Sequence, residues 1–86
     1  MNVITLSALP LCKSGYIKSI NINTDIKRRL LDMGFAAGEL VTTVFKSPLG
    51  DPTAYGIMGS VVALRNEITD EIYVIPADVS EVPSPC

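Results

Sequence analysis

Hydrophobic and polar positions alternate over several short stretches of the chain, and this alternation is typical of half-buried strands. Stretches of this kind, or stretches rich in β-branched and aromatic residues, predict five strands. They cover residues 15–22, 40–46, 53–58, 61–65 and 71–75. The segments between them carry turn-forming Gly, Pro, Asn or Asp, so the pattern favours a mainly β fold.

One segment follows the helical period instead. Ile26, Leu30 and Met33 fall on one face over residues 25–33, which predicts a short amphipathic helix. Asn23 or Thr24 can cap its start, and Gly34 is expected to end it with a positive φ. A helix of this length is not stable alone in water and must pack on the strands. Residues 66–70 form a polar connection that can hold one further helical turn.

The chain has 86 residues, which is one domain with a thin core. In so small a chain, a sheet of short strands can bury one of its faces by curving around a common core. We therefore expect a small SH3-like or OB-like, partly open antiparallel barrel of about five strands, with the short α-helix at one end. The domain is predicted to span residues 1–76, followed by a disordered C-terminal tail over residues 77–86.

The stretch from Ser47 to Pro52 reads SPLGDP and is longer and stiffer than a hairpin requires. Pro48 and Pro52 fix φ, Gly50 can adopt a positive φ, and Asp51 can hydrogen-bond to nearby backbone. Two readings of the loop stay open. Either it presents Leu49 at its tip to a partner, or it is a wide turn that tucks Leu49 into the barrel. Gly38 and Gly59 mark two further turns.

Charge is unevenly distributed along the chain, whose net charge is −2. Residues 1–65 hold seven bases and four acids, whereas residues 66–86 hold five acids and no base. An acidic protein is a poor candidate for nucleic-acid binding, which depends on neutralising phosphates. The run Lys27-Arg28-Arg29 is either a contact patch or a solvated helix face.

The residues needed for catalysis or for a metal centre are missing from the sequence. There is no His, and the two cysteines, Cys12 and Cys86, fit neither a disulfide framework nor a zinc motif. We expect Cys12 to be half-buried and Cys86 to be free, both reduced as in the cytoplasm. The sequence predicts no enzyme, no catalytic residue, no metal site and no cofactor. It contains no apolar run long enough to span a membrane and no signal peptide.

Several segments in order resemble the FeoA family, the small ferrous iron transport protein A. Residues 28–41 (RRLLDMGFAAGELV) resemble its R-x-L-x-x-[LM]-G-[LMF]-x-x-G-x-x-[VI] signature. Residues 48–52 resemble its A-P-L-G-D-P element, with Ser47 in place of Ala, and residues 59–65 its R-G-x-x-[LV]-[AS]-L-R element. The resemblance covers residues 5–76. The chain departs from the family where Leu11-Cys12 replaces Pro-Gly, and where Phe45, Gly56 and Met58 replace residues that are often charged.

The resemblance implies an SH3-like barrel in the cytoplasm that acts by contact with FeoB, a membrane iron permease with a G-protein domain. The chain would then be an accessory or regulatory binding module, a monomer when isolated, and neither nucleic-acid binding nor membrane-spanning. Candidate partner contacts are Arg28, Leu49, Asp51, Tyr55 and Met58, with Leu49 as apolar anchor and Arg28 at the rim. One alternative is a stand-alone, metal-linked SH3-like domain of the iron-dependent repressor type, for which ligands such as His are lacking. Another is an RNA-binding barrel, which would need a basic, aromatic surface.

Overall fold

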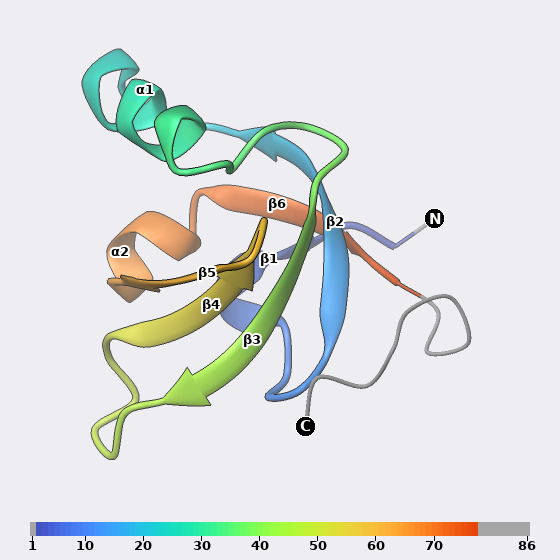
Figure 1. Ribbon diagram of the computed structural model, residues 1–86, viewed down its shortest axis with the longest axis vertical. Helices are drawn as coiled ribbons and strands as arrows, with labels where there is room; N and C mark the ends of the chain where they lie inside the picture. The colour runs from blue at the N-terminus through green and yellow to red at the C-terminus, as the bar shows by residue number, and fades with distance from the viewer. Residues whose placement is uncertain (1, 78–86) are drawn as a thin grey trace.

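The computed structural model describes residues 2–77, which form one curled antiparallel sheet with a helix at one end (Figure 1). In chain order the elements are β1 (Ile4–Thr5), a 3-10 turn η1 (Leu6–Ala8), β2 (Ser14–Ile20), α1 (Thr24–Asp32), β3 (Leu40–Lys46), β4 (Thr53–Ile57), β5 (Ser60–Leu64), α2 (Asn66–Thr69) and β6 (Ile72–Pro76). The strand order is β1-β6-β2-β3-β4-β5. The mainly β fold with one substantial helix is confirmed. The tail predicted over residues 77–86 lies, from residue 78 on, outside the described residues.

The structure contains one strand that the sequence pattern did not predict. β1 has only two residues and shows no alternation, and it is held by pairing with β6 through Ile4–Val74 and Thr5–Tyr73. A strand this short is defined by its partner strand and not by its own residues. At the opposite edge of the sheet lies β5, which pairs with β4.

The core is built from the inward-facing positions of the strands together with single residues of the helices and turns. Its buried hydrophobic members are Leu6, Leu9, Ile17, Ile20, Leu30, Phe35, Val41, Tyr55, Ile57, Leu64, Ile72 and Val74. Fully burying one such aliphatic side chain contributes roughly 1.5–3 kcal/mol. In the β4–β5 hairpin Tyr55 lies opposite Val62 and Thr53 opposite Leu64 on the inner face, whereas Ile57 lies opposite Ser60.

α1 begins and ends with local hydrogen bonds that its sequence specifies. The Asn23 side chain accepts a hydrogen bond from the backbone N–H of Ile26 at 3.0 Å. At the other end Gly34 has φ 104°, and the N–H of Phe35 donates to the carbonyl of Leu30 at 2.9 Å, which is a Schellman ending. Met33 is the C-cap residue and is 38% exposed, so it does not join Leu30 in the core as the helical period predicted.

A β-bulge in β3 changes the outer surface of the sheet. Thr43 pairs with Tyr55 and Phe45 pairs with Ala54, so Val44 is an extra residue on this strand. Because cross-strand partners share a face, Phe45 points outward with Ala54. The bulge therefore places two consecutive apolar side chains, Val44 and Phe45, on the outer face of β3.

Candidate functional site

The loop from Ser47 to Pro52 is fastened to the start of α2. Within the loop, the N–H of Gly50 donates to the carbonyl of Ser47 at 2.8 Å. Across to α2, the N–H of Asn66 donates to Asp51 Oδ1 and the Asn66 side-chain Nδ2 donates to the carbonyl of Gly50, each at 3.0 Å. α2 has no capping side chain of its own, so Asp51 supplies the acceptor that its first turn requires.

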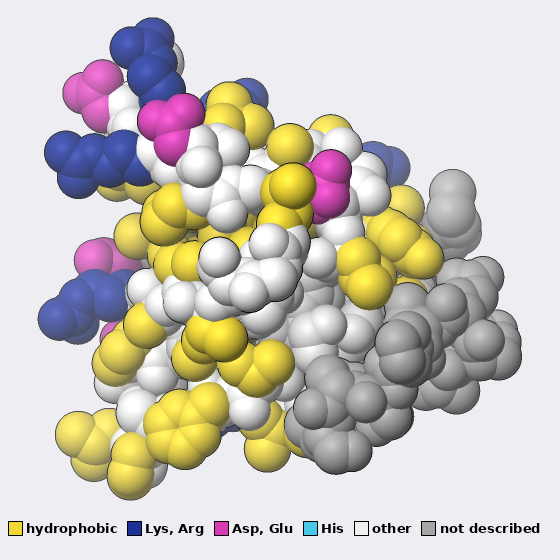
Figure 2. Space-filling model, viewed as in Figure 1, with side chains coloured by type: hydrophobic (Ala, Val, Ile, Leu, Met, Phe, Trp, Pro, Cys, Tyr) yellow, Lys and Arg dark blue, Asp and Glu magenta, His cyan; other side chains and the backbone are white. Residues whose placement is uncertain are grey.

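Leu49 sits at the tip of this fastened loop and is 94% exposed. It does not tuck into the barrel, so the reading of the loop as a wide turn that buries Leu49 is wrong. Phe45, at the end of β3, is 59% exposed. In Figure 2 hydrophobic side chains gather at this end of the molecule, at the lower left, where Figure 1 shows the β3–β4 loop. A rigid loop with an exposed aliphatic tip loses little entropy when it docks.

The helix next to this loop is α2 and not α1, so Arg28 is not at the rim of a contact centred on Leu49. Arg28 is exposed on α1, and Figure 1 shows α1 and the β3–β4 loop at opposite ends of the molecule. Lys and Arg side chains gather over α1 in Figure 2. Arg28 and Leu49 therefore do not form one continuous surface, and each defines a separate candidate contact.

Tyr55 and Met58, both candidate partner contacts, have different environments. Tyr55 is 1% exposed and faces the core, so its side chain is not available to a partner. Burial raises the pKa of Tyr55 above its ordinary value of 10.0, and the nearby Asp70 carboxylate acts in the same direction. Side-chain hydrogen bonds with Thr69 and Thr53 act in the opposite direction. Met58, at the tip of the hairpin, is 68% exposed.

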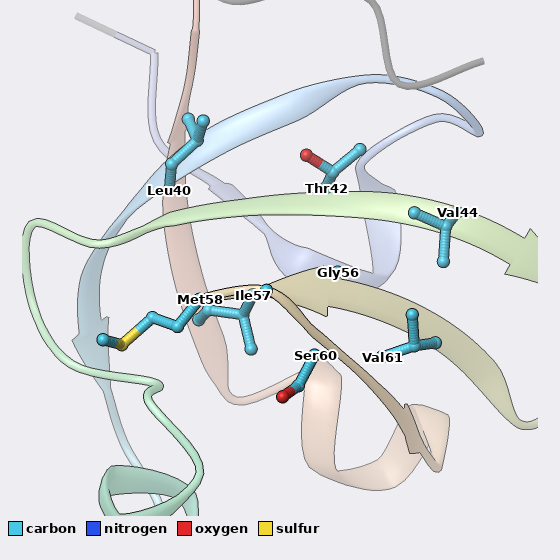
Figure 3. A pocket seen from close by; sticks show the side chains of 9 residues that line it. Leu40, Thr42, Val44, Gly56, Ile57, Met58, Ser60 and Val61 are labelled. Atoms are coloured by element: carbon cyan, nitrogen blue, oxygen red, sulfur yellow. The ribbon is translucent and has the colours of Figure 1, made fainter.

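An open apolar groove runs over the outer face of β3, β4 and β5 (Figure 3). It has a volume of about 350 Å³ and is lined by Leu40, Thr42, Val44, Gly56, Ile57, Met58, Gly59, Ser60 and Val61. Gly56 forms the floor of the groove, since it has no side chain. A Cβ at this position would project into the groove and lie 3.4 Å from Val44 Cγ1. The sequence pattern alone does not predict this groove. The alternation of Leu40, Thr42 and Val44 marks the outward face of β3, but the bulge and the strand order were needed to assemble the lining.

The predicted turn glycines all adopt the left-handed region, which spans φ 80–104° at Gly34, Gly38, Gly50 and Gly59. The flanking Pro48 and Pro52 are exposed, and the peptide bond between Asp51 and Pro52 is cis.

Cys12 also has a positive φ, 66°, at a position where the FeoA pattern given above has Gly. A non-glycine residue is strained in this region. Cys12 is disulfide-bonded in the structure and differs in this from the reduced thiol expected, whereas Cys86 lies outside the described residues.

Two further observations limit the chemistry of residues 2–77. No group of three or more Cys, Asp or Glu side chains among them is placed to hold a metal ion, and the sequence has no His. Over the same residues no helix is long and apolar enough to cross a membrane. The surfaces that remain are apolar contacts at Leu49 and the groove, together with a basic patch on α1.

Comparison with known proteins defines the family. The model of the FeoA domain matches residues 4–76, so the chain belongs to the FeoA domain family. A crystal structure of Stenotrophomonas maltophilia FeoA complexed with zinc, described as a prokaryotic SH3 domain protein, is 36% identical. The match covers 83% of this chain and 88% of that one, with a TM-score of 0.72. The SH3-like fold is confirmed, and the prediction of a non-enzymatic protein agrees with the family.

Two other relatives are longer than this chain. Iron(II) transport protein A from Clostridium thermocellum is 32% identical, with a TM-score of 0.81, over 85% of this chain and 45% of that one. An Fe(2+) transport protein A/Fe(2+) transporter FeoB fusion protein of Porphyromonas gingivalis is 44% identical over 48 residues. That match covers 56% of this chain, which spans only 6% of the length of the fusion protein.

Proposed function

We propose that this chain is a small accessory module of ferrous iron uptake that acts by contact with the cytoplasmic part of a FeoB-like permease. The relative in which an Fe(2+) transport protein A and a FeoB transporter share one polypeptide supports the pairing. Two proteins that are fused in one organism act at high effective concentration relative to each other. We treat iron as a property of the pathway and not as a cofactor of this chain, since the sequence lacks His, the commonest metal ligand.

The observation that carries the proposal is Leu49, an almost fully exposed aliphatic side chain on a loop that is fastened at both Gly50 and Asp51. Exposing a Leu at the tip of a rigid loop has no benefit to folding, since burial is what stabilises apolar groups. Apolar anchors at the centre of an interface carry most of its binding energy. We assign Leu49 this role, with Arg28 on α1 as a separate, electrostatic contact.

The test is binding of the full chain to a purified FeoB-like permease in detergent or nanodiscs. Leu49→Ala is expected to weaken binding by tenfold or more, with little dependence on salt. Leu11→Ala is the matched control, because Leu11 is also exposed, at 48%, but lies on the turn before β2. The melting temperature of Leu49→Ala should equal that of the wild type, since a side chain that is 94% exposed contributes little to the core. Unchanged affinity in a folded Leu49→Ala variant would contradict the anchor role.

Arg28→Glu separates the electrostatic contact from the apolar one. Its effect should be large at low ionic strength and small at high salt, because exposed charges are screened over about 8–10 Å in physiological salt. Since Arg28 and Leu49 lie at opposite ends of the molecule, the losses of binding free energy should add in the double variant. A strongly non-additive double variant would show that both residues belong to one contact.

A further inference from the structure

β5 is an edge strand whose outer backbone edge is open. Among the described residues it pairs only with β4, and it is the last strand of the sheet order. The hairpin turn has two residues, Met58 and Gly59, with φ of 48° and 80°, as in a type I′ turn. This turn makes Ile57 and Ser60 a hydrogen-bonded pair. Because ladder bonds alternate along an antiparallel strand, Val61 and Ala63 direct their N–H and C=O groups to the open edge.

This edge lacks the features that normally prevent strands from pairing with it. Edge strands of natural proteins are commonly protected by charged side chains, prolines or bulges. The hairpin from Thr53 to Leu64 contains no charged residue and no proline, and the β4–β5 register is uninterrupted. Val61 is 69% exposed on the outer face and borders the apolar groove. The open backbone edge and the groove therefore meet at Val61, and neither carries a charged side chain.

We propose that β5 binds an extended, uncharged apolar segment of the partner permease as an additional antiparallel or parallel strand. The segment's backbone would pair with Val61 and Ala63, and one of its aliphatic side chains would lie in the groove beside Val61. This inference rests on the proposed function, and it adds a second contact to the one at Leu49. Strand addition of this kind takes affinity from main-chain hydrogen bonds and specificity from side-chain pockets.

The groove suits an aliphatic side chain of the added strand. Gly56 leaves the floor without a side chain of its own, and Val44 and Leu40 supply apolar walls. Met58 borders the turn end of the groove, while its thioether points toward Gly34 and away from the other lining side chains (Figure 3). A charged segment would find no partner for its charge here, because none of the lining residues is ionisable.

A second copy of the chain fits this surface less well than an extended segment does. A stable interface buries about 800 Å² on each partner, which is roughly a seventh of the 5200 Å² surface of this molecule. A two-fold pairing of β5 with itself would join strands of five residues, about 17 Å long. An extended segment can pair with the edge of β5 and place a side chain in the groove. Unlike a second folded copy, it does not need a complementary folded surface.

Overlapping synthetic peptides that cover the soluble segments of a FeoB-like permease test this directly against the full chain. We expect a peptide of uncharged, β-branched composition to bind and to shift the amide resonances of Val61 and Ala63. N-methylation of alternate amides in that peptide should abolish binding in one register, because those amides pair with β5. N-methylation of the intervening amides, which point away, is the matched control. Binding that is equally tolerant of both methylation patterns would overturn the inference.

Two variants of the chain complete the test with the whole permease. Ala63→Pro removes an N–H that points away from β4, and Val61→Lys places a charge beside the groove. Each should weaken permease binding by about tenfold, while Leu11→Lys should not. A wild-type chain that does not bind the permease would contradict the proposed function and this inference together. A wild-type chain that binds, with both variants folded and binding equally well, would contradict only the inference. A dimer in sedimentation that Ala63→Pro dissociates would likewise overturn it, in favour of a second copy.

Discussion

The side chain of Met58 lies against Gly34, so the tip of the β4–β5 hairpin contacts the end of α1. A Cβ built on Gly34 would stand only 2.9 Å from Met58 Sδ and 3.3 Å from its Cγ. Gly34 also has φ 104°, a conformation that a side chain disfavours. Gly34 is thus required twice, once for the Schellman ending of α1 and once for the space that Met58 occupies.

Gly34→Ala is expected to lower the free energy of unfolding by about 1 kcal/mol or more, since both the strained φ and the contact with Met58 oppose the Cβ. Urea denaturation measures this. The double variant Gly34→Ala/Met58→Ala removes the steric clash between the new Cβ and the Met58 side chain, but it keeps the cost of the strained φ at position 34. It should therefore recover some of the loss relative to Met58→Ala alone. A Gly34→Ala midpoint equal to that of the wild type would show that neither constraint holds.

Asp51→Ala should destabilise the domain by about 1 kcal/mol, because it leaves the first N–H of α2 without its acceptor. Asn66→Ala keeps the backbone N–H that Asp51 accepts from and removes only the hydrogen bond from Nδ2 to the Gly50 carbonyl, so it is the second single variant of a double-mutant cycle between the two hydrogen bonds that fasten the loop. We expect a positive coupling energy between them. Full additivity would show that the two hydrogen bonds act independently, whereas two single variants as stable as the wild type would show that the loop is held by its own turn alone.

Ser47→Ala is expected to stabilise the protein. Among the described residues, Ser47 Oγ is a buried side-chain oxygen without a hydrogen-bond partner, and burying an unsatisfied hydroxyl costs about 1–3 kcal/mol. Alanine also stands at this position in the family pattern that the sequence resembles. A rise in melting temperature of a few degrees, typical of about 1 kcal/mol in a domain of this size, checks the prediction. Ser60→Ala, at an exposed position, is the control.

Much of this fold could be predicted from local patterns, and the failures have specific causes. β3 and the hairpin followed from alternation, and α1 from its period and from Asn23 and Gly34. β1 could not be predicted, because two residues carry no period and only β6 defines them. Met33 was expected in the core because the period was extended one residue past the helix, to a position where the chain already turns.

The candidate site was harder to predict because it depends on which elements become neighbours. The sequence identified the loop from Ser47 to Pro52 as unusually stiff, but not that Asn66 fastens it, since the two are joined only in three dimensions. Tyr55 is a candidate partner contact from the sequence but is buried, because alternation defines two faces without saying which one is exposed. The groove depends on the bulge at Val44, and no residue type in the sequence predicts a bulge at this position.

Folding should not depend on a metal ion. The core is complete from apolar side chains, and the described residues contain no cluster of ligands. Thermal unfolding followed by circular dichroism should give the same midpoint with and without a chelator. Anaerobic calorimetry with Fe(II) or Zn(II) should show no one-to-one site of micromolar affinity. A midpoint that falls on chelation would contradict the prediction.

Tyr55 should make the stability of the domain fall at alkaline pH. The folded-state pKa of Tyr55 is raised, first by its burial in the core. Its protonated form is therefore favoured in the folded protein, and its contribution is fully present below the unfolded-state value of about 10. As pH rises from there through the folded-state pKa, the unfolded chain releases this proton more readily and the contribution is lost.

Tyr55→Phe cannot ionise and provides the comparison. At neutral pH the variant should be less stable than the wild type, because it lacks the hydrogen bonds of the Tyr55 hydroxyl with Thr69 and Thr53. Between pH 9 and 11 the gap in unfolding free energy should narrow, since only the wild type loses the contribution of a neutral Tyr55. Taking the difference between the two proteins at each pH cancels the titration of all other groups that they share. A gap that stays constant across this range would show that Tyr55 ionises as readily in the folded chain as in the unfolded one.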